Sequence, residues 1–331
     1  MDFRTSFSIN PSPVRITYNS KVMLIGSCFT TEIGAKLEEG KINVNINPTG
    51  TIYNPVSIAN SLELVMQNRK SGEGDMYNFG NLYHSFLHDS KFSSRDPDKA
   101  IGKINSSTET SNRFLGQADL LFVTFGTSRI YRLKSTGNIV SNCHKIPAEE
   151  FTRELLSVEE ITVLWGELLD RLHSFNSKIK VVFTVSPIRH LKDGAHGNQV
   201  SKAVLILAIE KLLNNPVVAG YFPAYEIVMD DLRDYRYYAD DMLHLSDQAV
   251  EYIWEKFSEC YLDTAAAISY KEVRSITRAM KHRFLTDSTE DRMAFAANIL
   301  KKIGELEKHN SSLDFTMERH WFKSVIASGN T

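Results

Sequence analysis

Cysteine and long apolar runs are both scarce in this 331-residue chain. The three cysteines are Cys28, Cys143 and Cys260, and no two of them form a Cys-x-x-Cys pair. An odd, sparse set argues against a disulfide framework and against a structural zinc site. No apolar run approaches the roughly 20 residues that a membrane-spanning helix needs. We therefore expect neither a disulfide-stabilised secreted domain nor a membrane protein.

An excess of charge of one sign is also missing, because 38 basic residues face 40 acidic ones and the net charge is −2. That balance gives no reason to expect DNA or an anionic membrane as a partner. The first residues lack the basic-then-apolar order of a signal peptide, so a cytoplasmic location is expected. Hydrophobic residues make up 42% of the chain, which is ordinary for a globular protein with a sizeable core.

Five short segments have the character of strands. One alternates polar and apolar residues and the others are nearly continuous apolar runs; they are residues 22–25, 43–46, 120–125, 181–185 and 226–229. Helical periodicity separates them, ending near Gly40 and then covering residues 56–67, 158–175 and 201–213. This alternation predicts an α/β fold with a three-layer, doubly wound parallel sheet.

Two other regions depart from that alternation. Residues 70–117 are polar and predict loops with one helix, while residues 129–134 and 138–141 predict a hairpin around a Ser-Thr-Gly turn. From residue 263 onward the pattern is purely helical. Candidate buried positions there are Ile276, Met280, Phe295, Ile299 and Leu306. We expect an α/β domain over residues 1–262 and a helical extension over residues 263–331.

The turn Gly26-Ser27-Cys28-Phe29 lies where the first predicted strand meets the first helix. Open α/β sheets bind ligands at this carboxyl edge. The positive end of the helix dipole stabilises a thiolate or a substrate oxyanion there. Cys28 is therefore a candidate nucleophile. The competing interpretation is that Cys28 is a small buried hydrophobe, which is common for a free cysteine.

A second candidate lies in Asp240-Asp241-Met242-Leu243-His244. An Asp three residues before a His can bind the imidazole Nδ1–H and leave Nε2 free as a general base. The alternative is a solvated acidic turn with an incidental His. Further polar groups follow the other strands, or close the hairpin, in Asn47–Pro55, Gly126–Ser128, Asn142–Lys145 and Ser186–His190. The Cys and His positions have no recognised metal spacing and no nucleotide-binding motif is intact, so neither a metal nor a cofactor is expected.

Together these motifs resemble the GSCFA family, whose motif appears here as Gly26-Ser27-Cys28-Phe29 with Thr30 in place of Ala. The similarity spans residues 22–246 and includes all the blocks just named. The family in turn resembles the SGNH (GDSL-type) hydrolases, which are esterases, deacetylases and acyltransferases. That resemblance implies a flavodoxin-like sheet with strand order 2-1-3-4-5.

The resemblance also assigns roles. Cys28 matches the nucleophile position, Gly50 and Gly126 match oxyanion donors, and Asp241 and His244 match the last catalytic block. Two positions depart from the SGNH pattern. Ser27 stands where Asp is usual, which leaves it as an alternative nucleophile or, as we expect, the helix cap. Ser128 stands where the oxyanion Asn is usual. Because Ser128 is a weaker donor to the oxyanion than Asn, we expect Arg189 or Asn142 to act as a substitute donor. His144 and His190 are further candidates for contact with the substrate.

The sequence thus predicts an acyl-processing enzyme, either an esterase or deacylase or an acyltransferase. It would act through a covalent acyl-enzyme on Cys28, with His244 as base and Asp241 orienting it. A thiol nucleophile favours thioester chemistry or acyl transfer, so the expected substrate is an acylated carbohydrate or a thioester, with acyl-CoA as one donor to consider. The alternative from another class is a non-catalytic module that binds glycans or acyl ligands. Acyl group, acceptor and oligomeric state stay open.

Overall fold

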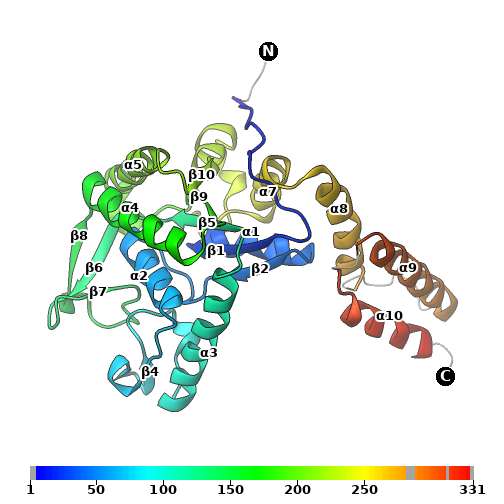
Figure 1. The fold of residues 1–331 in the computed structure, drawn as a ribbon, viewed down its shortest axis with the longest axis horizontal. Coiled ribbons are helices and arrows are strands. Elements are labelled where there is room, and N and C mark those ends of the chain that lie inside the picture. The colour runs from blue at the N-terminus through cyan, green and yellow to red at the C-terminus, as the bar shows by residue number, and fades with distance from the viewer. Residues whose placement is uncertain (1–4, 281–287, 311–312, 329–331) are drawn as a thin grey trace.

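Five parallel strands form the central sheet of the computed structural model, which describes residues 5–280, 288–310 and 313–328 (Figure 1). Their spatial order is β2–β1–β5–β9–β10, so the predicted order 2-1-3-4-5 is confirmed. The strands are β1 (Lys21–Gly26), β2 (Asn43–Ile46), β5 (Leu120–Phe125), β9 (Lys180–Val185) and β10 (Val218–Phe222). This is the flavodoxin-like order.

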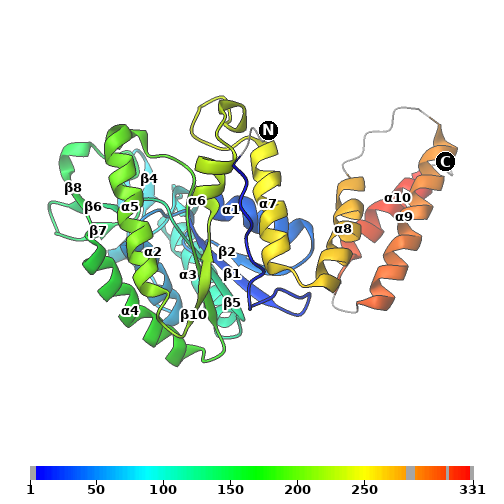
Figure 2. The ribbon, with the colours of Figure 1, turned by 90° about the horizontal axis from the view of Figure 1, so that it is seen from above.

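Helices cover both faces of the sheet, as Figure 2 shows. One face carries α2 (Pro55–Met66), α4 (Val158–Phe175) and α5 (Gly194–Leu212), with α3 (Pro97–Leu115) beside α2; the other carries α1 (Cys28–Glu39) and α7 (Asp247–Tyr261). Successive residues of β1 alternate between the two cores, Met23 facing one and Leu24 the other. Both are buried, which explains why the strands read as continuous apolar runs.

The prediction of a fifth strand at residues 226–229 is wrong. That segment forms α6 (Ala224–Glu226) and one π-helical turn (Ile227–Asp231). Ile227 and Val228 are neighbours and both buried in the same core, which a helical turn permits and a pleated strand does not. The strand itself is Val218–Phe222, where the pairing register shifts at Gly220. That irregular, glycine-containing segment lacks the apolar run expected of a buried strand.

Two small antiparallel units lie outside the main sheet. The predicted hairpin exists as β6 (Arg129–Leu133) and β7 (Ile139–Val140), and an unpredicted third strand, β8 (Phe151–Leu155), pairs with β6. In residues 70–117 the expected single helix is α3, accompanied by an unpredicted hairpin of β3 (Tyr77–Phe79) and β4 (Leu82–His84). Short 3-10 turns complete the described part at Glu73–Asp75, Ser90–Phe92, Ala148–Glu150, Leu191–Asp193 and Tyr235–Tyr237.

The C-terminal region is helical, as predicted, and contains α8 (Thr264–Ala279), α9 (Thr289–His309) and α10 (Thr316–Ser328) (Figure 1). These helices share a hydrophobic cluster of their own. Of the expected core positions, Ile276, Ile299 and Leu306 are buried, and Met280 and Phe295 are partly buried against the cluster. None of the helices in the described ranges combines the length and apolar character needed to cross a membrane.

Ion pairs attach α8 to the α/β domain. Arg274 on α8 lies between Glu39 on α1, at 2.7 Å, and Glu251 on α7. The Tyr270 hydroxyl donates to the carbonyl of Lys36 at 3.0 Å. Arg274 therefore contacts two carboxylates from different helices at once. The expected boundary between residues 262 and 263 coincides with the short link between α7 and α8 and stays a prediction.

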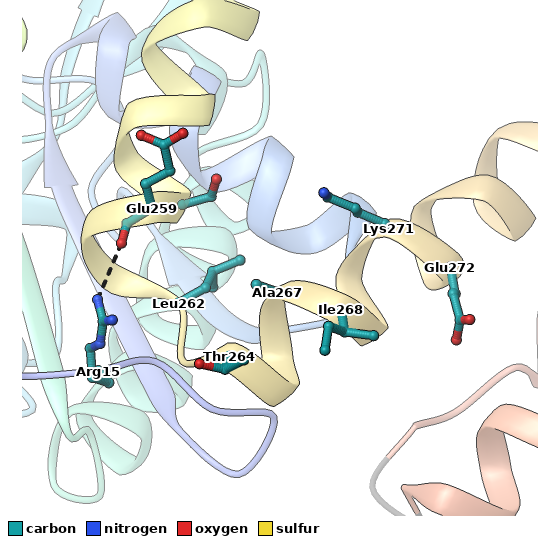
Figure 3. Close-up of a pocket in the computed structure, with 9 residues that line it drawn as sticks. Arg15, Glu259, Leu262, Thr264, Ala267, Ile268, Lys271 and Glu272 are labelled. Atoms are coloured by element: carbon teal, nitrogen blue, oxygen red, sulfur yellow. Dashed lines mark hydrogen bonds between the residues drawn. The ribbon is translucent and has the colours of Figure 1, made fainter. Parts of the chain in front are cut away.

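A pocket of about 500 Å³ lies at this junction (Figure 3). Arg15 lines it and donates to the carbonyl of Glu259 at the end of α7, at 3.2 Å. The pocket meets α7 at Ser258, 11 residues after the helix begins at Asp247, so roughly 17 Å of helix separates it from the residues just before α7. This pocket is therefore separate from the site predicted around His244.

Candidate functional site

The ends of the parallel strands bring several predicted residues to one edge of the sheet. Gly26 at the end of β1 is paired with Thr124 of β5, and Phe125 is paired with Val185 of β9. The segments that follow these strands therefore emerge on the same side. They contain Cys28, Gly126 and His190, respectively.

The turn before Cys28 has a backbone that only glycine suits. Gly26 has φ +142°, and a Cβ there would lie 2.3 Å from the carbonyl oxygen of Thr124. Its N–H donates to Asn47 Oδ1 at 2.8 Å, and Asn47 Nδ2 donates to Thr31 Oγ1 at 3.1 Å. Asn47 thus ties the end of β1 and the first turn of α1 to the segment that follows β2. The turn is held from both sides.

Ser27 and Cys28 differ in exposure. Ser27 occupies the N-cap position of α1, but its hydroxyl makes no capping hydrogen bond, so the expected side-chain cap is wrong. Ser27 is 2% exposed and its hydroxyl has no hydrogen-bond partner in the described part of the chain. Cys28 is partly exposed and is the first residue of α1. As a first-turn residue, its N–H has no carbonyl partner within the helix.

The side chain of Tyr53 contacts the Cys28 thiol. Its hydroxyl lies 3.5 Å from Cys28 Sγ. Burial raises the pKa of Tyr53, so the phenol stays protonated and can donate to sulfur. The edge of its ring meets His190, with centroids 5.6 Å apart. Burial lowers the pKa of His190 to about 4, so this imidazole is neutral at pH 7.

Three residues predicted to lie at the oxyanion site use their backbone N–H groups elsewhere. Gly126 N–H donates to the Tyr53 carbonyl at 2.7 Å. Gly50 N–H donates to the Asn47 carbonyl at 2.8 Å, within a turn. Ser128 is fully buried, and its N–H donates to Ser201 Oγ at 2.8 Å. The segment after β2 thus accepts from Gly126 and Gly50, and α5 accepts from Ser128, so these N–H groups are engaged in this structure and their role toward an oxyanion stays a prediction.

The Asp241–His244 pair has the geometry that its spacing predicts. His244 Nδ1 lies 2.5 Å from Asp241 Oδ2, and the backbone N–H of His244 donates to Asp241 Oδ1 at 2.9 Å. The hydrogen bond with His244 holds the pKa of Asp241 down to about 2, so the carboxylate is ionised near neutral pH. About half of the His244 side chain is exposed. No hydrogen bond or ring contact between His244 and Cys28 occurs among the described residues, so their cooperation stays a prediction.

The family assignment rests on two matches to family models. The model of the GSCFA family matches residues 21–257, which include the Cys28 turn and the Asp241–His244 pair. The chain belongs to the GSCFA family. The model of the GSCFA domain protein C-terminal domain matches residues 273–328, which cover the last part of α8 and all of α9 and α10. The C-terminal helices are therefore also a GSCFA feature.

Solved structures add one named similarity to the GSCFA match. An acetyl xylan esterase (Est2A) from the rumen bacterium Butyrivibrio proteoclasticus aligns with 73% of this chain at 12% sequence identity and a TM-score of 0.37. The alignment spans 62% of that chain, less than two thirds of its length. No curated protein matches this sequence.

Two predicted residues of this GSCFA chain lie in a different cluster. Asn142 Oδ1 accepts from the N–H of His144 at 2.9 Å, within their own turn. His144 Nε2 lies 2.9 Å from the carbonyl of Ser85, and its ring lies 4.5 Å from that of His84. Neither residue contacts Cys28 in the described ranges. Those ranges contain no group of three His, Cys, Asp or Glu side chains placed to hold a metal ion.

Lys202 is a buried residue that sequence reasoning missed. It is 1% exposed on α5, and its ammonium donates to the carbonyls of Gly126 and Ser186, each at 2.6 Å. It thereby fixes the ends of β5 and β9 behind the site. A signal exists in the sequence, because Lys202 lies three and seven residues before Leu205 and Ile209, on the buried face of the helix.

Burial lowers the pKa of Lys202 from 10.5 to about 7. Between these values the unfolded chain holds a proton that the folded protein has released, so folding stability rises with pH across this window. Below pH 7 both states are protonated and the dependence disappears. Lys202→Met should remove this contribution. From urea unfolding at pH 7.5 and 9.5, we expect the wild-type free energy of unfolding to gain about 2 kcal/mol relative to the variant. If the free energy of unfolding rose by the same amount in the wild type and in Lys202→Met, Lys202 would not be a buried lysine that titrates in this range.

Asn47 and Tyr53 were also missed as individual site residues. Both belong to the polar segment after β2. The sequence predicts that this segment follows a strand, but not which of its residues contact the thiol or the turn. Asn47 adopts φ +48°, a left-handed conformation that Asn tolerates better than most residues. An Asn directly after a strand and before Pro48 therefore indicates a left-handed turn at residue 47. The approach of Tyr53 to Cys28 depends on tertiary packing.

Proposed function

We propose that this protein is an acyl-processing enzyme that forms a covalent acyl-enzyme on Cys28. The observation that carries the proposal is the partly exposed Cys28 thiol at the first residue of α1, 3.5 Å from the Tyr53 hydroxyl. A helix N-terminus at the carboxyl edge of a parallel sheet suits a nucleophile and the negative charge that develops beside it. The GSCFA assignment is consistent with acyl chemistry.

In this mechanism Cys28 Sγ attacks the acyl carbonyl and a C–S bond forms. His244 Nε2 takes the thiol proton, and Asp241 holds the opposite nitrogen in its N–H form. The tetrahedral intermediate collapses, and the bond to the leaving group breaks as His244 returns the proton to it. Water or an acceptor hydroxyl then gives up a proton to His244, attacks the thioester and releases Cys28.

Two groups beside the reacting sulfur would stabilise the oxyanion, and one of them is the expected N–H of Cys28. The N–H of Cys28 has no intrahelical partner and lies next to the reacting sulfur. The protonated Tyr53 hydroxyl is a second donor, since it already lies beside the thiol. Two donors of this kind supply the electrostatic stabilisation that acyl transfer needs.

The proposal is tested with an ester and a thioester that carry the same acetyl group. We expect purified protein to release one equivalent of leaving group rapidly and then turn over more slowly, because acylation and deacylation are separate steps. A thioester should acylate Cys28 at least as fast as the matched ester. Addition of oligosaccharide acceptors distinguishes hydrolysis from transfer by the product formed. Absence of a burst and of turnover with both donors would contradict the proposal.

The second candidate is a module that binds acylated glycans without turnover. It is favoured by the engaged N–H groups of Gly126 and Ser128, which leave the usual oxyanion donors occupied. Saturable binding of an acetylated oligosaccharide without acetate release would support this candidate. Its binding would be insensitive to Cys28→Ala, whereas the enzymatic proposal requires the thiol.

A further inference from the structure

A pocket of about 610 Å³ lies beside the predicted catalytic pair. Met242, which lines it, is two residues before His244, and Tyr238, also in its wall, pairs with Leu245 in an antiparallel bridge. Arg189 enters the same pocket from the segment after β9. The pocket therefore borders the chain neighbours of both His244 and His190.

Two arginines and three tyrosines give this pocket its chemical character. Arg189 and Arg233 line it, and neither forms an ion pair with a carboxylate among the described residues. The nearest described partner of Arg189 is Met229 Sδ, at 3.4 Å. Such guanidinium groups can bind a carboxylate through charge-assisted hydrogen bonds. The tyrosines in the wall are Tyr225, Tyr235 and Tyr238.

The tyrosines favour a ligand with a flat apolar face. Tyr235 is 79% exposed, and its ring centroid lies 6.3 Å from that of Tyr238. Exposed aromatic rings lose little conformational entropy when they contact a ligand. The Tyr225 hydroxyl donates to Gln199 and the side chain is buried, with the Lys202 ammonium over its ring, so Tyr235 and Tyr238 are the rings that a ligand can reach.

Two carboxylates in the same wall limit the charge of the ligand. Asp230 and Asp234 line the pocket with the two arginines, and Asp234 is already paired with Arg236 outside the lining, at 3.6 Å. The carboxylates would repel a ligand with several phosphates. The two arginines can balance the single negative charge of a polyhydroxylated ligand. Carboxylates accept hydrogen bonds from sugar hydroxyls.

From these features we infer that this pocket binds a sugar bearing a single carboxylate, such as a uronic acid residue, and that Arg189 and Arg233 recognise the carboxylate. The inference rests on the proposed function in one respect: the sugar would be part of the acylated substrate or of the acceptor. Binding itself needs no chemistry at Cys28.

The test uses Cys28→Ala protein and a matched pair of ligands, methyl glucuronoside and methyl glucoside, which differ in a carboxylate against a hydroxymethyl group. By NMR titration at low salt, we expect the glucuronoside to bind at least about tenfold more tightly, the size expected for one charge-assisted hydrogen bond. Arg189→Gln and Arg233→Gln should each abolish most of that preference. Arg95→Gln is the control, because Arg95 is exposed and lies outside the pocket.

Three results would overturn the inference: equal binding of the two glycosides, an unchanged preference in both arginine variants, or tighter arginine-dependent binding of coenzyme A than of the glucuronoside. The last result would assign the pocket to a phosphate-bearing acyl donor. Because the titration uses protein without the thiol, failure of acyl-enzyme formation in the wild type cannot produce any of these results. The two proposals therefore fail separately.

Discussion

Cys28→Ala protein is expected to lose almost all acyl turnover, whereas Ser27→Ala protein should keep a substantial part. The reason is exposure. Cys28 is partly exposed, while Ser27 is 2% exposed and cannot meet a substrate without rearrangement of the turn. The measurement is kcat/KM with an activated ester for both variants beside the wild type. Activity that survives Cys28→Ala and is lost in Ser27→Ala would identify a serine enzyme and remove the thioester mechanism.

Alkylation provides an independent test of the same thiol. Cys260 is buried and burial raises its pKa; burial also raises the pKa of Cys143. Both thiols should react slowly, because the thiolate is the reactive form. At pH 7.5, limiting iodoacetamide should modify Cys28 first and abolish activity in proportion. Faster modification of Cys143, with activity retained, would contradict the assignment.

His244→Ala should lower kcat/KM by about a hundredfold or more, as expected when a positioned general base is removed. About half of the His244 side chain is exposed, so its loss should leave the fold intact, which circular dichroism can check. Asp241→Asn should have a smaller effect because Asp241 orients the imidazole and does not itself accept the proton.

His190→Gln is the matched comparison for this prediction. His190 contacts Tyr53, whose hydroxyl lies beside the thiol, but its pKa of about 4 makes it a weak base at neutral pH. We expect the His190 variant to retain more activity than the His244 variant. If His190→Gln were inactive and His244→Ala active, the base would be His190, and the Asp241–His244 pair would be a surface feature.

Most of the sheet could be predicted because strands buried on both faces leave continuous apolar runs. β5 is such a strand, and its predicted bounds match the observed ones. β10 could not be found this way, since Gly220 interrupts its register and the apolar residues that follow it pack as a helical turn. A run of three apolar residues, as at 227–229, is too short for its periodicity to separate strand from helix.

The site was predictable only in part. The Asp241–His244 hydrogen bond is local, and a spacing of three residues was enough to predict it. Whether a backbone N–H at the site is free or engaged depends on residues far away in the sequence. Gly126 is engaged because Tyr53, far away in the sequence, brings its carbonyl over the end of β5. The same crossing places the Tyr53 hydroxyl beside Cys28, which no motif in the sequence indicates.

The most direct measurement is the identity of the residue acylated by an activated ester. Protein mixed with p-nitrophenyl acetate, quenched in acid within the burst and digested should yield one acetylated peptide containing Cys28. Neutral hydroxylamine should remove the acetyl group, as expected for a thioester. His244→Ala should slow the formation of this adduct. An acetyl group on Ser27 that resists neutral hydroxylamine, or no adduct on either residue, would contradict the proposed chemistry of Cys28.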